Sequence, residues 1–218
     1  MKNKNLYFIH GWGFDSNFWV PLFRELKKNI ENSFEISFFN FGYFNKPFYP
    51  KIKEKNKHNK NFFITHSFGY NWLLKNFNYY DGLINFCGSS KYFCCENIKV
   101  QKQINEMIKM LKIDPEIVLK KFYINSGIRN YKKDKLINTE LLIESLNILK
   151  NENLERLEKI NNNPKLNIYC SEDKILNVKN LTKSKNDVII NGDHCLPFKS
   201  PKKTSKIILN FLREHDEL

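Results

Sequence analysis

The sequence predicts an α/β fold in which a mostly parallel sheet is covered by helices on both faces. Short apolar runs alternate with segments whose apolar residues recur at helical spacing, which is typical of such a fold. The 218 residues, 41% of them hydrophobic, suit one domain with a buried core. The predicted strands, which suggest a sheet of about six, are Leu6–Ile9, Phe34–Phe41, Asn61–His66, Gly82–Phe86, Leu166–Cys170 and Val188–Ile190.

Helices are expected between these strands. Segments Asn17–Asn29, Phe68–Phe77 and Pro201–Arg213 each carry apolar residues at the spacing of one helix face. Lys46–Lys60 is basic and rich in Asn, with two prolines, so we expect a surface loop with a short helix there.

The alternation stops between Ser90 and Pro164. This stretch contains long amphipathic helical patterns and no strand signal. We therefore predict a core domain formed by residues 1–90 and 165–218, interrupted by a helical cap, or lid, over residues 91–164.

The composition is basic, with 36 Lys and Arg against 23 Asp and Glu and a net charge of +13. A basic surface can attract nucleic acid, an anionic membrane or an acidic protein. The charges are spread along the chain without a nucleic-acid-binding motif, which disfavours the first. The chain lacks a signal-like N-terminal segment and any window of roughly 20 apolar residues. We expect a cytoplasmic monomer without membrane contact.

The cysteines and histidines show no metal or redox pattern. The five cysteines are odd in number, and no pair has two-residue spacing, so we expect reduced thiols. No ligand spacing relates the histidines and carboxylates, so we expect neither a metal nor another cofactor. The cysteines are Cys87, Cys94, Cys95, Cys170 and Cys195.

A candidate nucleophile follows the third predicted strand. In the segment THSFG, a strand reaching Ser67 turns directly into a helix, which is the pattern of a nucleophile elbow. Gly69 would let the helix pass close to the strand. Thr65 replaces the first glycine of the usual pattern, so an ordinary strand-to-helix turn remains an alternative for this motif taken alone.

A glycine-rich loop, HGWG, follows the first predicted strand. Acyl transfer from a serine needs two N–H donors aimed at the developing oxyanion. In an elbow fold, one comes from the residue after the nucleophile, here Phe68, and the other from this early loop, here Trp12. An ordinary glycine turn with a packed tryptophan is the alternative. His10 is expected to hold the loop and not to react.

An acid and a base follow the fifth and sixth predicted strands. A serine nucleophile needs a base, and an imidazole base needs a carboxylate to fix its tautomer. His194 is the candidate base, and the chain order of serine, acid and histidine is that of an elbow hydrolase. Glu172, Asp173 and Asp193 compete for the acid role. Because Asp193 adjoins His194 in sequence, we expect its carboxylate to point elsewhere.

The motifs together resemble those of a known family. HGWGFDSNFW and HCLPFKSPKK are similar to segments of the pimeloyl-acyl-carrier-protein methyl ester esterases of biotin synthesis, with THSFG and SEDKIL between them in matching order. The resemblance implies an α/β-hydrolase fold with a reduced sheet. It implies Ser67 as nucleophile, Asp173 as acid and His194 as base. It covers the sheet portion, while the cap matches only in position and length.

The resemblance also implies a substrate and a partner. The substrate would be the methyl ester of a pimeloyl chain carried by an acyl carrier protein, and no cofactor would be needed. Basic cap residues are candidates for docking that acidic partner, with a solvated helical face as the alternative. These candidates are Lys120, Lys121, Arg129 and Lys132.

Two other functions remain open. The same three side chains would serve a general short-chain carboxylesterase or a thioesterase. A carrier-binding protein that has kept the fold and lost catalysis is the alternative without enzymatic activity.

Overall fold

The computed structural model contains a six-stranded sheet whose neighbouring strands are all parallel, in the order β2-β1-β3-β4-β5-β6. The predicted parallel sheet is therefore confirmed. The strands are β1 (Lys4–Ile9), β2 (Glu35–Phe38), β3 (Lys60–His66), β4 (Gly82–Phe86), β5 (Lys165–Cys170) and β6 (Asp187–Ile190). The structure describes residues 3–53, 59–91, 98–131, 136–178, 181, 184–215 and 217–218.

The central strands are buried, and most of their side chains are apolar on both faces. In β1 and β3, every residue after the first is buried, and β4 is buried throughout. The register aligns Ile9 with Thr65 and Thr65 with Asn85, so the carboxyl ends of β1, β3 and β4 lie level. Loops that leave these strands therefore meet at one edge of the sheet, where open α/β sheets place their sites.

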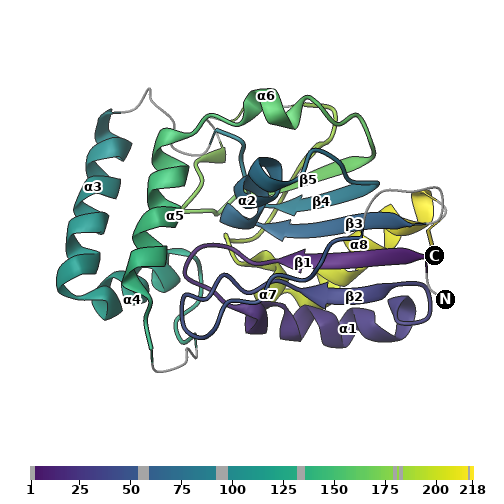
Figure 1. The fold of residues 1–218 in the computed structure, drawn as a ribbon, viewed down its shortest axis with the longest axis horizontal. Coiled ribbons are helices and arrows are strands. Elements are labelled where there is room, and N and C mark those ends of the chain that lie inside the picture. The colour runs from purple at the N-terminus through teal and green to yellow at the C-terminus, as the bar shows by residue number, and fades with distance from the viewer. Residues whose placement is uncertain are drawn as a thin grey trace.

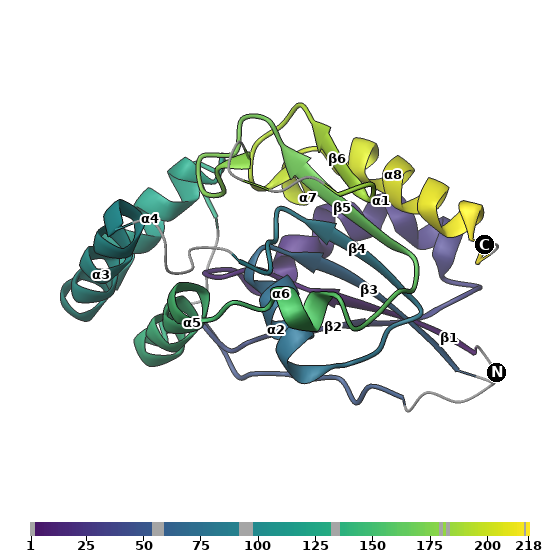
Figure 2. The same ribbon diagram turned by 90° about the horizontal axis from the view of Figure 1, so that it is seen from above.

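Helices cover both faces of the sheet (Figures 1 and 2). The long α1 and α8 pack against one another on one face, with α7 beside α1, and α2 lies on the opposite face with α6. These elements are η1 (Ser16–Trp19), α1 (Val20–Ile30), α2 (Phe68–Asn76), α6 (Glu155–Glu158), α7 (Leu196–Lys199) and α8 (Pro201–Glu214).

Among the described residues, the segment between β4 and β5 contains four helices and no strand. Three of its helices lie beyond the carboxyl ends of the strands, at the left of Figure 1, and α3 packs against α4 and α5. The three are α3 (Ile98–Ile113), α4 (Pro115–Asn125) and α5 (Thr139–Asn151). We call these three helices and their connections the cap.

Side-chain caps fix where two cap helices begin. The Asp114 carboxylate accepts the Ile117 N–H at 3.0 Å before α4, and Asn138 accepts the Leu141 N–H at 3.1 Å before α5. Each bond satisfies one of the amide donors that a helix leaves unpaired at its first turn.

The strand expected over Phe34–Phe41 is shorter, and only Glu35–Phe38 is a strand. Beyond it, Asn40 forms an isolated antiparallel bridge with Phe48. No helix forms in Lys46–Lys53, the described first part of the expected loop with a short helix. Residues 54–58, the remainder of that expected loop and helix, lie outside the described residues.

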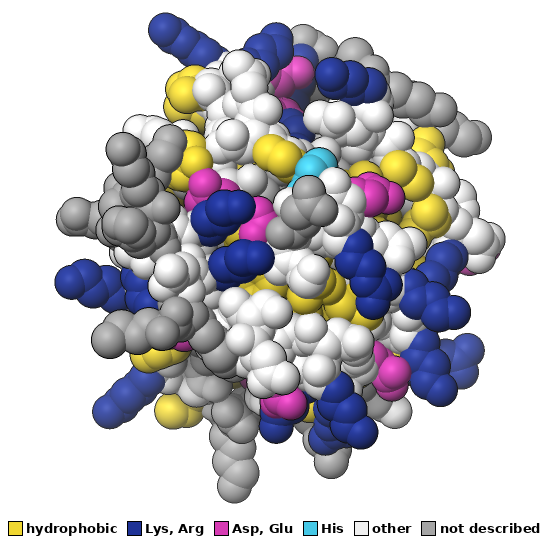
Figure 3. Space-filling model, turned by 90° about the vertical axis from the view of Figure 1, so that its right-hand side faces the viewer, with side chains coloured by type: hydrophobic (Ala, Val, Ile, Leu, Met, Phe, Trp, Pro, Cys, Tyr) yellow, Lys and Arg dark blue, Asp and Glu magenta, His cyan; other side chains and the backbone are white. Residues whose placement is uncertain are grey.

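Basic side chains are distributed over more than one side of the molecule. Figure 3 shows the side opposite the cap, with lysine and arginine scattered around it and acidic groups between them. Within the described ranges, no helix is long and apolar enough to cross a membrane.

Candidate active site

Ser67 lies at a sharp turn between β3 and α2. Its backbone has φ 52° and ψ −122°, in the positive-φ region that residues with a side chain rarely adopt. The turn is forced by a close approach of α2 to β1. A Cβ atom at Gly69 would lie 2.6 Å from the Ile9 oxygen and 2.7 Å from the His10 oxygen, so only glycine fits there.

Thr65 is accommodated where an elbow usually has a glycine. Its side chain is fully buried, and its hydroxyl donates to the Asn85 side-chain oxygen on β4 at 3.3 Å. The neighbouring strand therefore supplies both space and a hydrogen-bond acceptor for this larger side chain.

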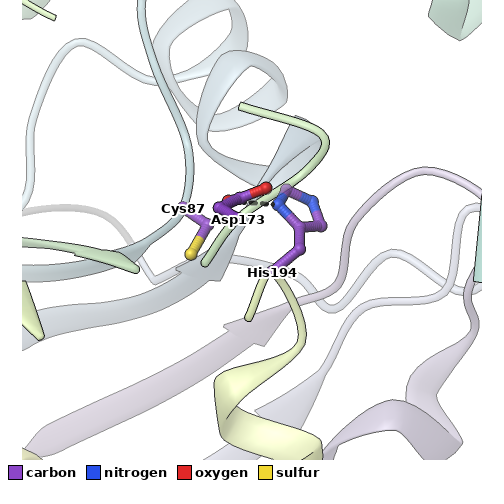
Figure 4. Close-up of side chains that lie close together, drawn as sticks. All are labelled: Cys87, Asp173 and His194. Atoms are coloured by element: carbon purple, nitrogen blue, oxygen red, sulfur yellow. Dashed lines mark hydrogen bonds and ion pairs between the residues drawn. The ribbon is translucent and has the colours of Figure 1, made fainter. Parts of the chain in front are cut away.

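Ser67, His194 and Asp173 form a hydrogen-bonded chain. The His194 Nδ1–H donates to the Asp173 Oδ2 at 2.7 Å, which Figure 4 marks with a dashed line. Because a carboxylate only accepts, the proton sits on Nδ1 and leaves Nε2 as an acceptor. The Ser67 hydroxyl donates to that Nε2 at 3.0 Å. In the sequence, His194 is 21 positions from Asp173 and 127 positions from Ser67, so the fold brings distant residues together.

The Asp173 carboxylate is held ionised in a buried place. Burial by itself would raise its pKa, but the charge and hydrogen bond of His194 act in the opposite direction. The other oxygen accepts the Ile175 and Leu176 N–H groups at 2.7 and 2.9 Å. Together these partners lower the pKa of Asp173 below its ordinary value.

The two competing carboxylates point away from the imidazole. Glu172 accepts a hydrogen bond from the Asn191 side chain at 3.0 Å, in an exposed position. Asp193 is paired with Lys199. Of the three candidate acids, only Asp173 is hydrogen-bonded to His194.

Trp12 and Phe68, the candidate oxyanion donors, belong to two segments that meet at Ser67. A Cβ atom at Gly11 would be 3.0 Å from the Ser67 Cβ, so the loop after β1 passes directly beside the serine. Phe68 is the first residue of α2, where backbone N–H groups have no partner within the helix. Among the described residues, neither the Trp12 N–H nor the Phe68 N–H donates to a protein acceptor.

The fold is similar to those of several solved structures. The structure is similar to a bromoperoxidase from Bacillus anthracis, with a TM-score of 0.77, 14% identity and coverage of 97% of this chain and 92% of that one. It is also similar to an esterase from Exiguobacterium antarcticum, with a TM-score of 0.74, 12% identity, and 96% and 92% coverage. The chain has the α/β-hydrolase fold.

MenH from S. aureus is a third similar structure, with a TM-score of 0.67, 15% identity, and 99% and 96% coverage. The sequence matches no protein-family model and no curated protein. The hydrolase fold is therefore established from the structure, because sequence identity to these proteins is low.

His10 ties the HGWG loop to the segment after β2. Its Nδ1–H donates to the Gly11 oxygen at 2.8 Å, and its Nε2 accepts the Phe41 N–H at 3.1 Å. A protonated ring could not accept from Phe41. Burial, opposed by the hydrogen bond to Gly11, lowers the pKa of His10 to about 4. As expected from sequence, His10 holds the loop.

His66 has a structural link to the base that the sequence did not reveal. Its Nε2–H donates to the His194 backbone oxygen at 3.0 Å, and its ring stacks on Phe18 with centroids 4.4 Å apart. Burial and the neighbouring His194 hold the pKa of His66 well below its ordinary value. The sequence predicts no role in the chemistry for His66, His58 or His215. His215 is exposed, and His58 lies outside the described residues.

Cys87 lies beside Asp173 and His194 (Figure 4), and ligand atoms of the three lie within 4.8 Å of one another. A metal would need a thiolate and a free imidazole nitrogen. The hydrogen bond with Cys170 and burial raise the pKa of Cys87, and the Nδ1 of His194 is already bonded to Asp173. The geometry therefore favours a hydrogen-bonded triad over a metal centre. Cys94 and Cys95 lie outside the described residues.

The candidate docking residues lie on the cap. Lys120 and Lys121 are exposed on α4, and Arg129 is exposed in the segment after it. None of the three forms an ion pair with a described residue. Lys132 lies outside the described residues.

The neutral state of His10 predicts a loss of stability in acid. An unfolded histidine takes up its proton near pH 6.5, whereas folded His10 does so only near pH 4, so the unfolded state gains protons first as the pH falls. His10 alone should remove on the order of 2 kcal/mol of unfolding free energy between about pH 7 and about pH 5. Urea unfolding of the His10→Gln variant should show a shallower pH dependence than the wild type.

The exposed His215 provides the matched control. The variant His215→Gln should keep the wild-type pH dependence because its side chain faces solvent. Equal slopes for His10→Gln and the wild type would contradict the assignment.

Loss of the donor at His66 should destabilise the protein around His194. The variant His66→Phe leaves the His194 carbonyl without its partner, which should cost about 1–3 kcal/mol of stability. In the variant His66→Gln, an amide N–H can take the place of Nε2–H, so this variant should lose less. Urea unfolding of the two variants measures both losses. A phenylalanine variant as stable as the glutamine variant would show that the bond has no influence.

Proposed function

We propose that this protein is a serine esterase that hydrolyses carboxylic esters through an acyl-enzyme on Ser67. The observation that carries the proposal is the chain of hydrogen bonds from Ser67 through His194 to Asp173, at 3.0 and 2.7 Å. A serine is a weak nucleophile at neutral pH and needs such a base. The strained backbone of Ser67, at φ 52°, supports the same conclusion because strain of this kind clusters at functional sites.

In the first half of the reaction, the Ser67 oxygen attacks the ester carbonyl while His194 Nε2 takes the hydroxyl proton. The imidazolium that forms is stabilised by the ionised Asp173. The tetrahedral oxyanion would be held by the Trp12 and Phe68 N–H groups. When the intermediate collapses, the alcohol leaves with the proton from His194, and the acyl group stays on Ser67.

In the second half, water attacks the acyl-enzyme. His194 takes a proton from the water, and the oxyanion forms again at the same donors. Collapse breaks the bond to the Ser67 oxygen, which regains its proton from His194. The products are a carboxylic acid and an alcohol, and both the serine and the histidine return to their starting states.

For the substrate, we propose the methyl ester of a pimeloyl chain on an acyl carrier protein. The support is the resemblance of HGWGFDSNFW and HCLPFKSPKK to esterases of that kind, and the exposed basic residues Lys120, Lys121 and Arg129 on the cap. An acidic carrier would be attracted to such a cap. A short-chain carboxylesterase or thioesterase uses the same chemistry and differs only in what the cap admits.

Removing the nucleophile should abolish the reaction. The Ser67→Ala variant should lose hydrolysis of p-nitrophenyl acetate by a factor on the order of 10⁴ or more, and it should no longer be labelled by a fluorophosphonate. A steady-state assay and a gel-based labelling assay measure these losses. An active Ser67→Ala variant would exclude Ser67 as the nucleophile. An inactive and unlabelled wild type would instead favour the carrier-binding protein without catalysis.

The neighbouring acids supply a matched comparison. The Asp173→Asn variant should lose about 10⁴ in kcat, as expected when the wrong tautomer of the base is favoured. Asp193→Asn should stay close to wild type because that carboxylate is paired with Lys199. A reversed order would assign the acid role to Asp193.

Charge reversal on the cap tests the carrier. The variant with Lys120→Glu, Lys121→Glu and Arg129→Glu should lower kcat/KM for a carrier-linked methyl ester about tenfold or more, and it should leave p-nitrophenyl acetate unaffected. Equal losses on both substrates would reject docking at this surface.

The control for this variant carries the same change of charge on the helices that cover one face of the sheet. Arg24, Lys28 and Lys202 are exposed on α1 and α8. Their reversal to glutamate should leave turnover of the carrier-linked ester unchanged. A similar loss in this control would point to a long-range effect of total charge.

A further inference from the structure

We propose that the cap positions the loop that stabilises the oxyanion, and that Tyr123 of α4 is its main positioning residue. We call residues 12–15 the oxyanion loop. The inference rests on the proposed esterase function, and it assigns to the cap a task beyond covering the site. Each of the four residues of the oxyanion loop is contacted by a described residue of the cap.

The Trp12 side chain is fixed by two cap helices. Its indole N–H donates to the Leu142 backbone oxygen on α5 at 2.8 Å. Its ring meets the Phe122 ring of α4 edge-on, with centroids 4.8 Å apart. The side chain is 2% exposed. Because this side chain is locked, the backbone N–H of the same residue has little freedom to turn away from Ser67.

Gly13 is held through its carbonyl. The Tyr123 hydroxyl donates to the Gly13 oxygen at 2.6 Å, in a buried position. Burial raises the pKa of Tyr123, which keeps the hydroxyl protonated and able to donate. Gly13 has φ 70°, and a Cβ atom there would lie 3.2 Å from Leu119 and 3.4 Å from Phe122. The loop backbone is therefore pressed directly against α4.

The last two residues of the oxyanion loop are enclosed by aromatic cap residues. The Phe14 ring lies 5.5 Å from the Tyr123 ring and 5.0 Å from the Tyr131 ring, centroid to centroid. The Tyr131 hydroxyl donates to Asp15 Oδ1 at 2.7 Å. Asp15 in turn caps η1 by accepting the Asn17 N–H at 2.9 Å.

The far end of α4 contacts the loop that carries the base. The Cys195 N–H donates to the Ser126 oxygen at 3.2 Å. Gly127 has φ 89°, and a Cβ atom there would overlap the Asp193 carboxylate, so these two segments are in direct contact. One cap helix and the turn after it therefore brace both the oxyanion loop and the loop of His194.

The position of an oxyanion donor strongly affects rate. Such a donor acts only where the charge develops, and a displacement of about 1 Å can cost about 100-fold in rate. The Tyr123 hydroxyl holds the Gly13 carbonyl, which is close along the backbone to the Trp12 N–H. Loss of the hydroxyl should therefore let the Trp12 N–H drift. The effect should fall on kcat, because the oxyanion exists only in the transition state and the intermediate.

The test compares two tyrosines that each lose one buried hydroxyl between core and cap. In Tyr123→Phe, kcat on p-nitrophenyl acetate should fall about tenfold or more, with KM within about twofold of wild type. Tyr43 donates to Ser145 of α5 at 2.7 Å and lies outside the oxyanion loop. The Tyr43→Phe variant should therefore keep the wild-type kcat. Equal kcat in the two variants would overturn the inference.

Hydrogen exchange provides a second measurement that needs no activity. Backbone amides of residues 11–15 should exchange faster in Tyr123→Phe than in wild type or Tyr43→Phe, while β3 stays protected in all three. Unchanged exchange in this loop would overturn the inference even if the enzyme is active. A wild type that no fluorophosphonate labels would refute the esterase function, and the exchange result would still show whether Tyr123 holds the loop. Should Tyr123→Phe not fold, Phe122→Leu, which removes the ring packed on Trp12, should show the same fall in kcat and the same faster exchange.

Discussion

The site depends on how closely helix α2 approaches the end of β1. The absence of a side chain at Gly69 lets the helix backbone lie against the Ile9 and His10 carbonyls. Gly11 in turn lets the loop after β1 lie against His66 and Ser67. With both contacts made, the chain has no room for a gradual turn, and Ser67 adopts its positive φ. Any side chain at either glycine would separate the serine from the loop that faces it.

This crowded region contains three ionisable groups whose charge states differ for physical reasons. Burial keeps His10 and His66 neutral, and the Phe41 N–H that His10 accepts requires a neutral ring. Asp173 is equally hidden, yet its hydrogen-bond donors keep it charged. Among the residues that the structure describes, the Asp173 carboxylate is the only negative charge in contact with His194. That arrangement favours a base that becomes positive during the reaction.

The sequence predicted the sheet because apolar strands and the polar motifs after them are local patterns. Ser67 and His194 became candidates in this way, since parallel strands bring their carboxyl ends to one edge. The same pattern left three acids open, and the family resemblance favoured Asp173. Contacts between distant segments left no local signal. The bond from His66 to the His194 backbone and the bond from Tyr123 to Gly13 each join a side chain to a carbonyl far away in sequence. The bridge between Asn40 and Phe48 likewise joins two positions that no local pattern connects.

The bond between Tyr123 and Gly13 has a consequence for exchanging caps between hydrolases. A transplanted cap would bring its own residues to the place of Tyr123, Phe122 and Leu142, and the HGWG loop would find no matching partners. In such chimeras the HGWG loop would lose the contacts that position it, whatever molecule the new cap admits. The HGWG loop and the cap would have to be transferred together.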